Sequence, residues 1–130
     1  MTLKQNKMIN EDFVSFEIAR LLKEKGFDIY VSSFYDVDGE FSRKEADWNW
    51  NIGSRYSAPT LQMAMKWLRE MHGLYVVVRP YVTEEGILSL FDIKSIKEKD
   101  IVVNIRTKTG FDSYEEACEA AIKYCLENWI

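Results

Sequence analysis

The sequence predicts an α+β fold, in which about three helices pack on one face of a mainly antiparallel sheet of about five strands. The expected order is α-β-β-α-β-β-β-α. Three segments of helix length carry apolar residues at helical spacing. Between them lie segments rich in β-branched and aromatic residues, separated by glycine-containing turns. With 130 residues, 47% of them hydrophobic, the chain is long enough to bury a core as one domain, 1–130.

The first helix is expected to begin after Asn10, a good N-cap residue, and to end at Gly26. Its apolar stripe consists of Val14, Ile18, Leu21 and Leu22. Phe13 and Phe16 lie off this stripe. Because a surface helix rarely leaves two phenylalanines in water, we expect either residues 29–41 or a second subunit to cover them.

The next residues predict a hairpin of two strands. Residues 28–35 alternate loosely, and Asp38-Gly39 is a hairpin turn signal. Residues 40–52 are expected to return as a strand that carries Trp48, Trp50 and Ile52 on one side.

The second helix is expected to open at residues 57–60, since proline is tolerated in a first helical turn, and to end at Gly73. Its inner face is expected to hold Leu61, Ala64, Met65, Leu68, Met71 and His72. Three more strands are expected at residues 74–82, 87–93 and 101–107.

The last helix has the clearest start, because Ser113 and Glu116 form a capping box. The residues expected on its inner face are Tyr114, Ala117, Cys118, Ala121, Cys125 and Trp129. Those expected on its outer face are Glu116, Glu119, Lys123 and Glu127. The small inner side chains favour close packing on a sheet.

The two halves of the chain also resemble each other weakly. A shift of 47 residues places Gly26 on Gly73 and Gly39 on Gly86. Internal duplication is one explanation. The other is that glycine supplies the positive φ that joints between helices and strands require.

Composition argues against several classes of protein. The net charge of −4 does not suit general binding of nucleic acid, which favours a basic surface. The longest apolar run, residues 74–78, is far shorter than the ~20 residues of a membrane span. Residues 1–12 are polar and lack the apolar segment of a secretory signal. We therefore expect a cytoplasmic protein without a membrane partner.

No motif of a hydrolase, a phosphate-binding loop or a metalloprotease is found, so we expect no enzyme, no cofactor and no metal site. His72 is the only histidine, and it suits the negative end of the second helix. Cys118 and Cys125 are too far apart on one helix to bond to each other, and buried thiols suit a reducing compartment. A small enzyme that uses paired carboxylates remains a third hypothesis.

The most unusual stretch is residues 41–56, where aromatic and basic residues alternate. The candidate partner-binding residues are Trp48, Trp50, Arg55, Tyr56 and, from the first helix, Phe16. These residue types are enriched at protein interfaces, and they also stack on bases. The two tryptophans would otherwise face the core. Our leading hypothesis is a small interaction protein that binds another protein or itself. Nucleic-acid or nucleotide binding is the alternative.

From residue 59 onward, the expected order α-β-β-β-α resembles a double-stranded-RNA-binding domain. That family holds phosphates with lysines at the start of its last helix, where this chain has Tyr114, Glu115 and Glu116. The Gly-Pro-x-His loop of the family has no counterpart in residues 83–86. The resemblance therefore implies the fold and not RNA binding.

Two runs, residues 56–70 and 113–127, resemble segments of a family of small uncharacterised proteins from gut Bacteroidales and their phages. Residues 21–28 add a weaker match. The two runs cover 30 of the 130 residues, and they consist of helix caps and core stripes. The resemblance implies a phage or prophage setting and no particular activity.

Overall fold

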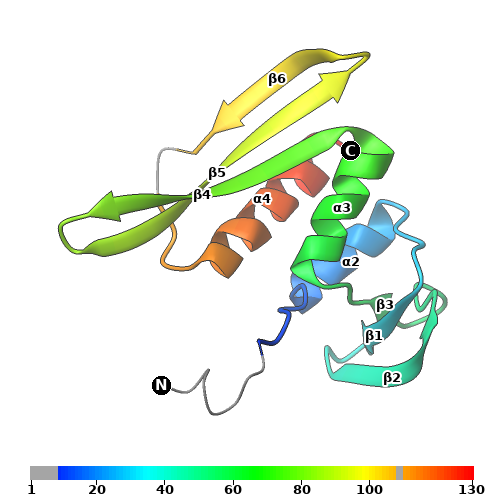
Figure 1. Cartoon of the computed structure of the whole chain (residues 1–130). Helices are drawn as coiled ribbons and strands as arrows, with labels where there is room; N and C mark the ends of the chain where they lie inside the picture. Colours follow the sequence, from blue (N-terminus) through cyan, green and yellow to red (C-terminus); the bar gives the residue numbers. More distant parts are fainter. Residues whose placement is uncertain (1–8, 108–109) are drawn as a thin grey trace.

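Three helices lie between two small antiparallel sheets in the computed structural model, which describes residues 9–107 and 110–130 (Figure 1). The helices are α2 (Phe16–Glu24), α3 (Leu61–His72) and α4 (Tyr114–Asn128). The strands are β1 (Val31–Tyr35), β2 (Phe41–Trp48), β3 (Tyr56–Ser57), β4 (Leu74–Thr83), β5 (Gly86–Lys97) and β6 (Asp100–Arg106).

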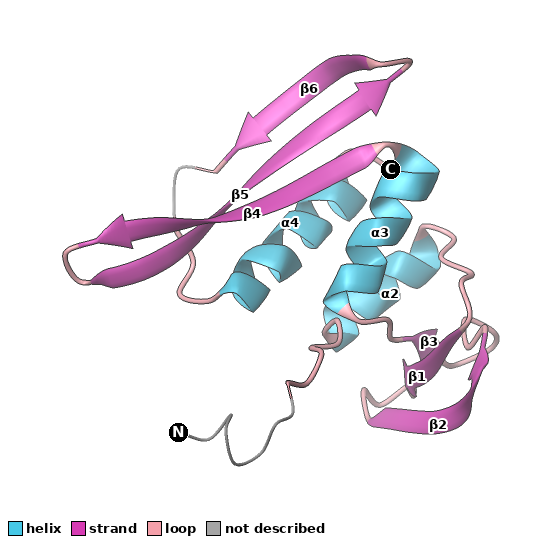
Figure 2. Cartoon of the chain, in the orientation of Figure 1, coloured by secondary structure: helices cyan, strands magenta, loops and turns pink. Residues whose placement is uncertain are grey.

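The predicted α+β class is confirmed, but the expected single sheet is wrong. The strands form two sheets on opposite sides of the helices (Figure 2). We call β2-β1-β3 the small sheet and β4-β5-β6 the large sheet. The short strand β3 was not expected, because two residues show no periodicity. Strand β2 ends at Trp48, so the predicted strand over residues 40–52 is too long. Sequence patterns identify hairpins, whereas the assignment of hairpins to one sheet or two depends on tertiary packing.

The first helix begins five residues later than the sequence predicts, with Ser15 rather than Asn10 as its N-cap. The Ser15 hydroxyl accepts a hydrogen bond from the backbone N–H of Ile18 at 3.3 Å. The preceding residues are extended, because they pair with the segment before α3. Leu61 N–H donates to the Asp12 carbonyl at 2.9 Å, and Val14 N–H donates to the Pro59 carbonyl at 3.0 Å. These long-range bonds compete successfully with the helix.

The predicted end of α3 at Gly73 and the predicted start of α4 agree with the structure, whereas α3 starts only at the end of the predicted opening over residues 57–60, because Ser57 belongs to β3 and Pro59 precedes the cap. Thr60 caps α3, and Gly73 ends it in the left-handed conformation with a φ of 65°. The Ser113 hydroxyl accepts from Glu116 N–H at 3.0 Å, which is the first half of the predicted capping box. The contacts of Gly73 and Ser113 each reach no more than four residues along the chain, so the spacing of residues in the sequence is enough to predict these two helix ends.

Four assignments of residues to helix faces need correction. Met71 is 63% exposed, whereas Trp67 is buried and packs edge-on against Phe27 at 5.3 Å between ring centroids. On α4, Tyr114 is exposed rather than inward, and Glu119 is half-buried rather than outward. In each case the position of the neighbouring helix or loop, and not the stripe alone, decides what is covered.

Helix α4 lies close on the large sheet, as its small residues predict. The side chains of Ala117, Ala121, Cys118 and Cys125 are fully buried, and both cysteines are free thiols. Burial raises the pKa of Cys118 to about 11 and that of Cys125 to about 12. Among the described residues, no helix is long and apolar enough to cross a membrane.

The units α2-β1-β2 and α3-β4-β5 follow the same order, and the four glycines that a shift of 47 residues aligns all have positive φ. Duplication and the conformational freedom of glycine both account for this observation. Internal duplication therefore stays a prediction.

Candidate functional site

The face of the small sheet that lies toward α2 is an aromatic layer. The Phe16 ring packs against Tyr35 and Tyr56, at 5.5 Å from each centroid. The Phe13 ring packs against Phe41 at 5.0 Å. Strands β1 and β2 therefore cover both phenylalanines, which confirms the first of the two covers expected from the sequence.

Two predicted site residues, Phe16 and Tyr56, thus lie half-buried within this packing. The Tyr35 hydroxyl belongs to the same layer and donates to the Val14 carbonyl at 2.6 Å. A Cβ at Gly39 would lie 3.1 Å from the Phe16 ring, so the turn between β1 and β2 also packs closely against Phe16. Phe16 and Tyr56 therefore take part in the packing between α2 and the small sheet.

The opposite face of the small sheet is built around Phe34, whose side chain is only 4% exposed. The Trp50 ring lies over it at 4.7 Å between centroids. The guanidinium carbon of Arg55 lies 4.6 Å from the Phe34 centroid, and the Lys44 ammonium lies 6.0 Å from it. Two cations and an indole therefore surround one buried ring, in the geometry of cation–π contacts.

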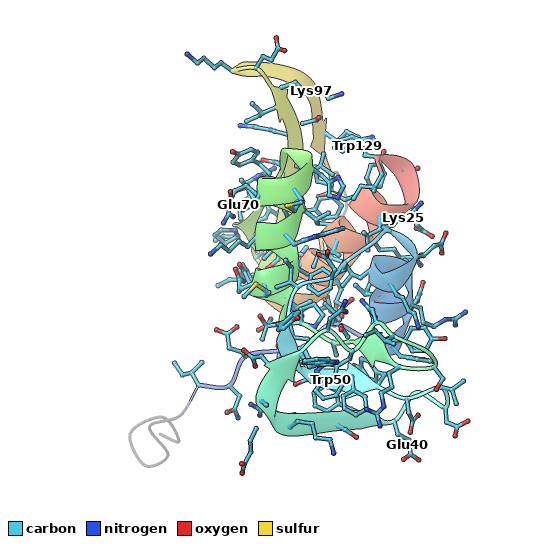
Figure 3. The ribbon with its side chains drawn as sticks, turned by 90° about the vertical axis from the view of Figure 1, so that its right-hand side faces the viewer. Lys25, Glu40, Trp50, Glu70, Lys97 and Trp129 are labelled. Carbon is cyan, nitrogen blue, oxygen red and sulfur yellow. The ribbon has the colours of Figure 1, made fainter. Side chains whose placement is uncertain are left out.

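Trp50 is held in one orientation, beside the strands of the small sheet (Figure 3). Its indole N–H donates to the Val31 carbonyl at 2.6 Å, and its backbone N–H donates to the Ser57 hydroxyl at 3.0 Å. Trp50 is half-buried and packs against the main core. Trp48, two residues earlier, is 51% exposed and touches the ring of Tyr30. The sequence left open whether the two tryptophans face the core or the surface. Trp50 lies closer to the core, and Trp48 lies at the surface.

The loop that follows β2 is fixed by its own asparagines and by α2. The Asn51 amide donates to the Phe27 carbonyl at 2.8 Å and accepts from Ser57 N–H at 2.7 Å. The Lys23 ammonium donates to the carbonyl of Gly53 and, at 3.0 Å, to that of Arg55. Residues 49–57 are therefore organised before any ligand binds.

This loop presents a shallow cavity of about 360 Å³, lined in part by Trp48, Trp50, Ile52 and Arg55. We call these four residues the Trp48 surface. Ile52 is 62% exposed and Arg55 is exposed. An indole, an aliphatic side chain and a guanidinium group thus stand together at the surface.

The Trp48 surface is positively charged on balance. Arg43, Lys44 and Arg55 form no ion pair with any residue in the described part of the chain. Lys44 and Arg55 lie over the Phe34 ring instead, whereas Arg43 lies 5.3 Å from the Phe13 centroid, on the opposite face of the small sheet. Glu45 and Asp47, on β2, are the nearby acidic residues in sequence.

Other candidate groups lie apart from this surface. The His72 ring packs against Trp67 at 4.7 Å, and burial lowers the pKa of its imidazole. Within residues 9–107 and 110–130, no group of three or more His, Cys, Asp or Glu side chains is placed to hold a metal ion. The burial of the two thiols disfavours their nucleophilic thiolate form.

The structure thus brings together three predicted residues, Trp48, Trp50 and Arg55. Sequence reasoning missed Phe34, because a buried aromatic residue in a strand looks like ordinary core. It also missed the loop that Asn51 organises. The predicted strand over residues 40–52 included Asn49 and Asn51, although asparagine is typical of turns. That signal could have ended the predicted strand at Trp48.

Comparisons of the chain with models of protein families, with curated proteins and with solved structures find no match.

Proposed function

We propose that the chain is an interaction protein whose Trp48 surface binds an acidic and apolar segment of a partner protein. The observation that carries the proposal is the exposure of Trp48 and Ile52 beside Arg55, on a loop held by hydrogen bonds. Tryptophan and arginine dominate the energetics of many protein interfaces. A surface fixed beforehand loses little conformational entropy on binding.

The charge of the surface indicates the chemistry of the partner. The guanidinium carbon of Arg55 lies 4.6 Å from the Phe34 centroid and 5.7 Å from the Trp50 centroid, and these two contacts restrict where the group lies. Its N–H groups can then donate to a carboxylate in the bidentate geometry that arginine favours. Two copies of this surface would repel each other through Lys44 and Arg55. The proposed partner therefore carries the opposite charge.

Single-stranded nucleic acid is the alternative ligand for the same surface. Trp48 and Tyr30 form an exposed pair of rings, 5.6 Å apart, on which bases could stack. Glu45 and Asp47 on β2 and the net charge of −4 oppose a polyphosphate backbone. These charges favour a protein ligand.

A peptide-display selection tests the proposal. We expect the wild-type chain to enrich peptides that combine Asp or Glu with a large apolar residue. We expect Arg55→Glu and Trp48→Ala to abolish binding of the enriched peptides. Lys66→Glu is the matched control, because it makes the same charge change at an exposed position of α3.

Two outcomes would overturn the proposal. One is enrichment that Arg55→Glu and Lys66→Glu affect equally. The other is binding of a single-stranded oligonucleotide, lost in Arg55→Glu and falling steeply with salt, without any peptide enrichment. That result would assign the surface to nucleic acid.

A further inference from the structure

The large sheet has one covered face and one open face. Leu74, Phe91 and Ile93 point toward the helices and belong to the main core. The register of β4 and β5 places the alternate residues on the other face. These residues are Tyr75, Val77, Arg79 and Tyr81 of β4, and Leu88, Leu90, Asp92 and Lys94 of β5. In the part of the chain that the structure describes, all the helices lie on the covered side (Figure 2).

The open face exposes three large apolar side chains on β4, whereas Leu90 and Asp92 of the central strand β5 are only 8% and 7% exposed. Tyr75 is 39% exposed, Val77 is 48% exposed and Tyr81 is 51% exposed. A sheet with one solvated face normally alternates apolar and polar residues, whereas strands that are apolar on both faces are covered on both. An exposed patch of this kind is typical of an interaction site.

We propose that a second copy of this chain covers the open face, so that the large sheets of two copies pack face to face about a two-fold axis. The charge on the face supports an identical partner. Arg79 Nε lies 3.3 Å from Asp92 Oδ2, and the Asp92 side chain is only 10% exposed. Because each of these two charges has a partner within its own copy, an apolar partner leaves neither of them unpaired, and Lys94 is a further charged residue that the register places on this face. The Trp48 surface, by contrast, is cationic and requires a different partner.

The size of the face also fits a dimer. Strand β5 has 12 residues, which span about 40 Å, and three strands about 4.8 Å apart give a width of about 14 Å. The plane of the sheet is then about 500 Å², and its side chains raise the accessible area toward the ~800 Å² per partner of a standard interface.

Packing through the edge of β4 is a less favourable arrangement. Pro80 interrupts this edge strand, and a proline has no N–H to donate to an added strand. The open face is also separate from the Trp48 surface. Figure 3 shows Lys97, at the end of β5, and Trp50 at opposite ends of the molecule. The dimer would therefore leave both Trp48 surfaces free, and it does not depend on the proposed function.

Light scattering after size-exclusion chromatography tests the dimer. We expect the wild-type chain to show twice its mass of 15.3 kDa at micromolar concentration. Val77→Glu should show the monomer mass, because it places a carboxylate at the centre of the interface. Val37→Glu is the matched control, since Val37 is 61% exposed in the turn of the small sheet. Circular dichroism and Tm measure whether each variant is folded.

Cross-linking gives a second measurement that does not rely on a destabilising substitution. We expect Val77→Cys and Tyr81→Cys to be joined between copies by a flexible bismaleimide, and Val37→Cys to remain single. The native thiols should not react at neutral pH, because their pKa values are about 11 and about 12. A wild-type monomer at high micromolar concentration would overturn the proposal. So would a dimer that Val77→Glu leaves intact and that cross-links through Val37→Cys.

Discussion

The carboxylate of Glu119, in the middle of α4, holds the start of α2. Its Oε1 accepts a hydrogen bond from the backbone N–H of Ser15 at 2.8 Å, and its Oε2 accepts from the Ser15 hydroxyl at 3.3 Å. The two residues are 104 positions apart in the chain. Ser15 is therefore bonded in both directions, to Glu119 and to the first turn of its own helix. This contact helps to explain why α2 begins at Phe16 rather than near Asn10.

The first prediction concerns removal of this contact. Glu119→Ala should lower the free energy of unfolding by about 1–3 kcal/mol, because it leaves the Ser15 N–H without its partner. Glu119→Gln should cost less, because its amide oxygen still accepts from Ser15. Urea denaturation at neutral pH measures both. Equal losses for the two variants would contradict the assigned role of the hydrogen bond.

The second prediction concerns pH. Burial raises the pKa of Glu119 above its ordinary value of 4.5, so the folded state holds this proton more tightly than the unfolded state. The contribution of Glu119 to stability is then complete below pH 4.5 and declines as the pH rises through the raised pKa. Glu119→Gln removes this decline. We expect the stability of the variant relative to wild type to improve between pH 4 and pH 7, as measured by urea denaturation across that range. A constant difference would show that the pKa of Glu119 is not raised.

The third prediction separates the two tryptophans. Trp50→Ala should lower the free energy of unfolding by about 2–3 kcal/mol, somewhat less than a fully buried tryptophan, because it uncovers Phe34. Trp48→Ala should cost less than about 1 kcal/mol, because Trp48 is half in solvent and its ring packs against the exposed Tyr30. Thermal unfolding followed by circular dichroism measures both. Similar losses would mean that Trp48 belongs to the core and not to a binding surface.

The fourth prediction compares two glycines that end helical segments. Gly73 has a φ of 65°, and a Cβ there would lie 2.6 Å from the Ile96 carbonyl oxygen. Gly26 has a φ of 88°, with no atom within 4 Å of such a Cβ. Gly26→Ala should therefore cost only the conformational penalty of about 1–2 kcal/mol. Gly73→Ala should cost more, because α3 and β5 must also separate. Urea midpoints of the two variants provide the test, and equal costs would rule out the close approach.

The fifth prediction concerns the turn between β5 and β6. Glu98 and Lys99 have φ values of 51° and 74°, and together they form a two-residue hairpin loop. Asn-Gly adopts this conformation most readily. The double substitution Glu98→Asn with Lys99→Gly should raise the free energy of unfolding by about 1 kcal/mol. Lys99→Ala is the control, since it removes the side chain and keeps the unfavourable φ. No gain over this control would contradict the strain assigned to the turn.

Sequence reasoning found those features that depend on neighbours within a few residues. Gly73 and Ser113 mark helix ends through contacts inside one turn, so their spacing is sufficient evidence. The candidate site was found in part. Trp48, Trp50 and Arg55 drew attention as an aromatic and basic group, but their order in the chain does not show which of them is exposed. That depends on Phe34 and on the loop that Asn51 and Lys23 hold in place.

The sequence by itself determined the α+β class, the start of α4, the glycine ends of α2 and α3 and the hairpins, because periodicity and capping are local. Only the tertiary structure decided that the strands form two sheets and that α2 begins at Ser15. It also decided that Glu119 turns inward to meet Ser15, and that one face of the large sheet stays open. The physical reason is the same in each case. Backbone and side-chain hydrogen bonds must be satisfied and apolar surface must be covered, and the groups that do so lie tens of residues away along the chain.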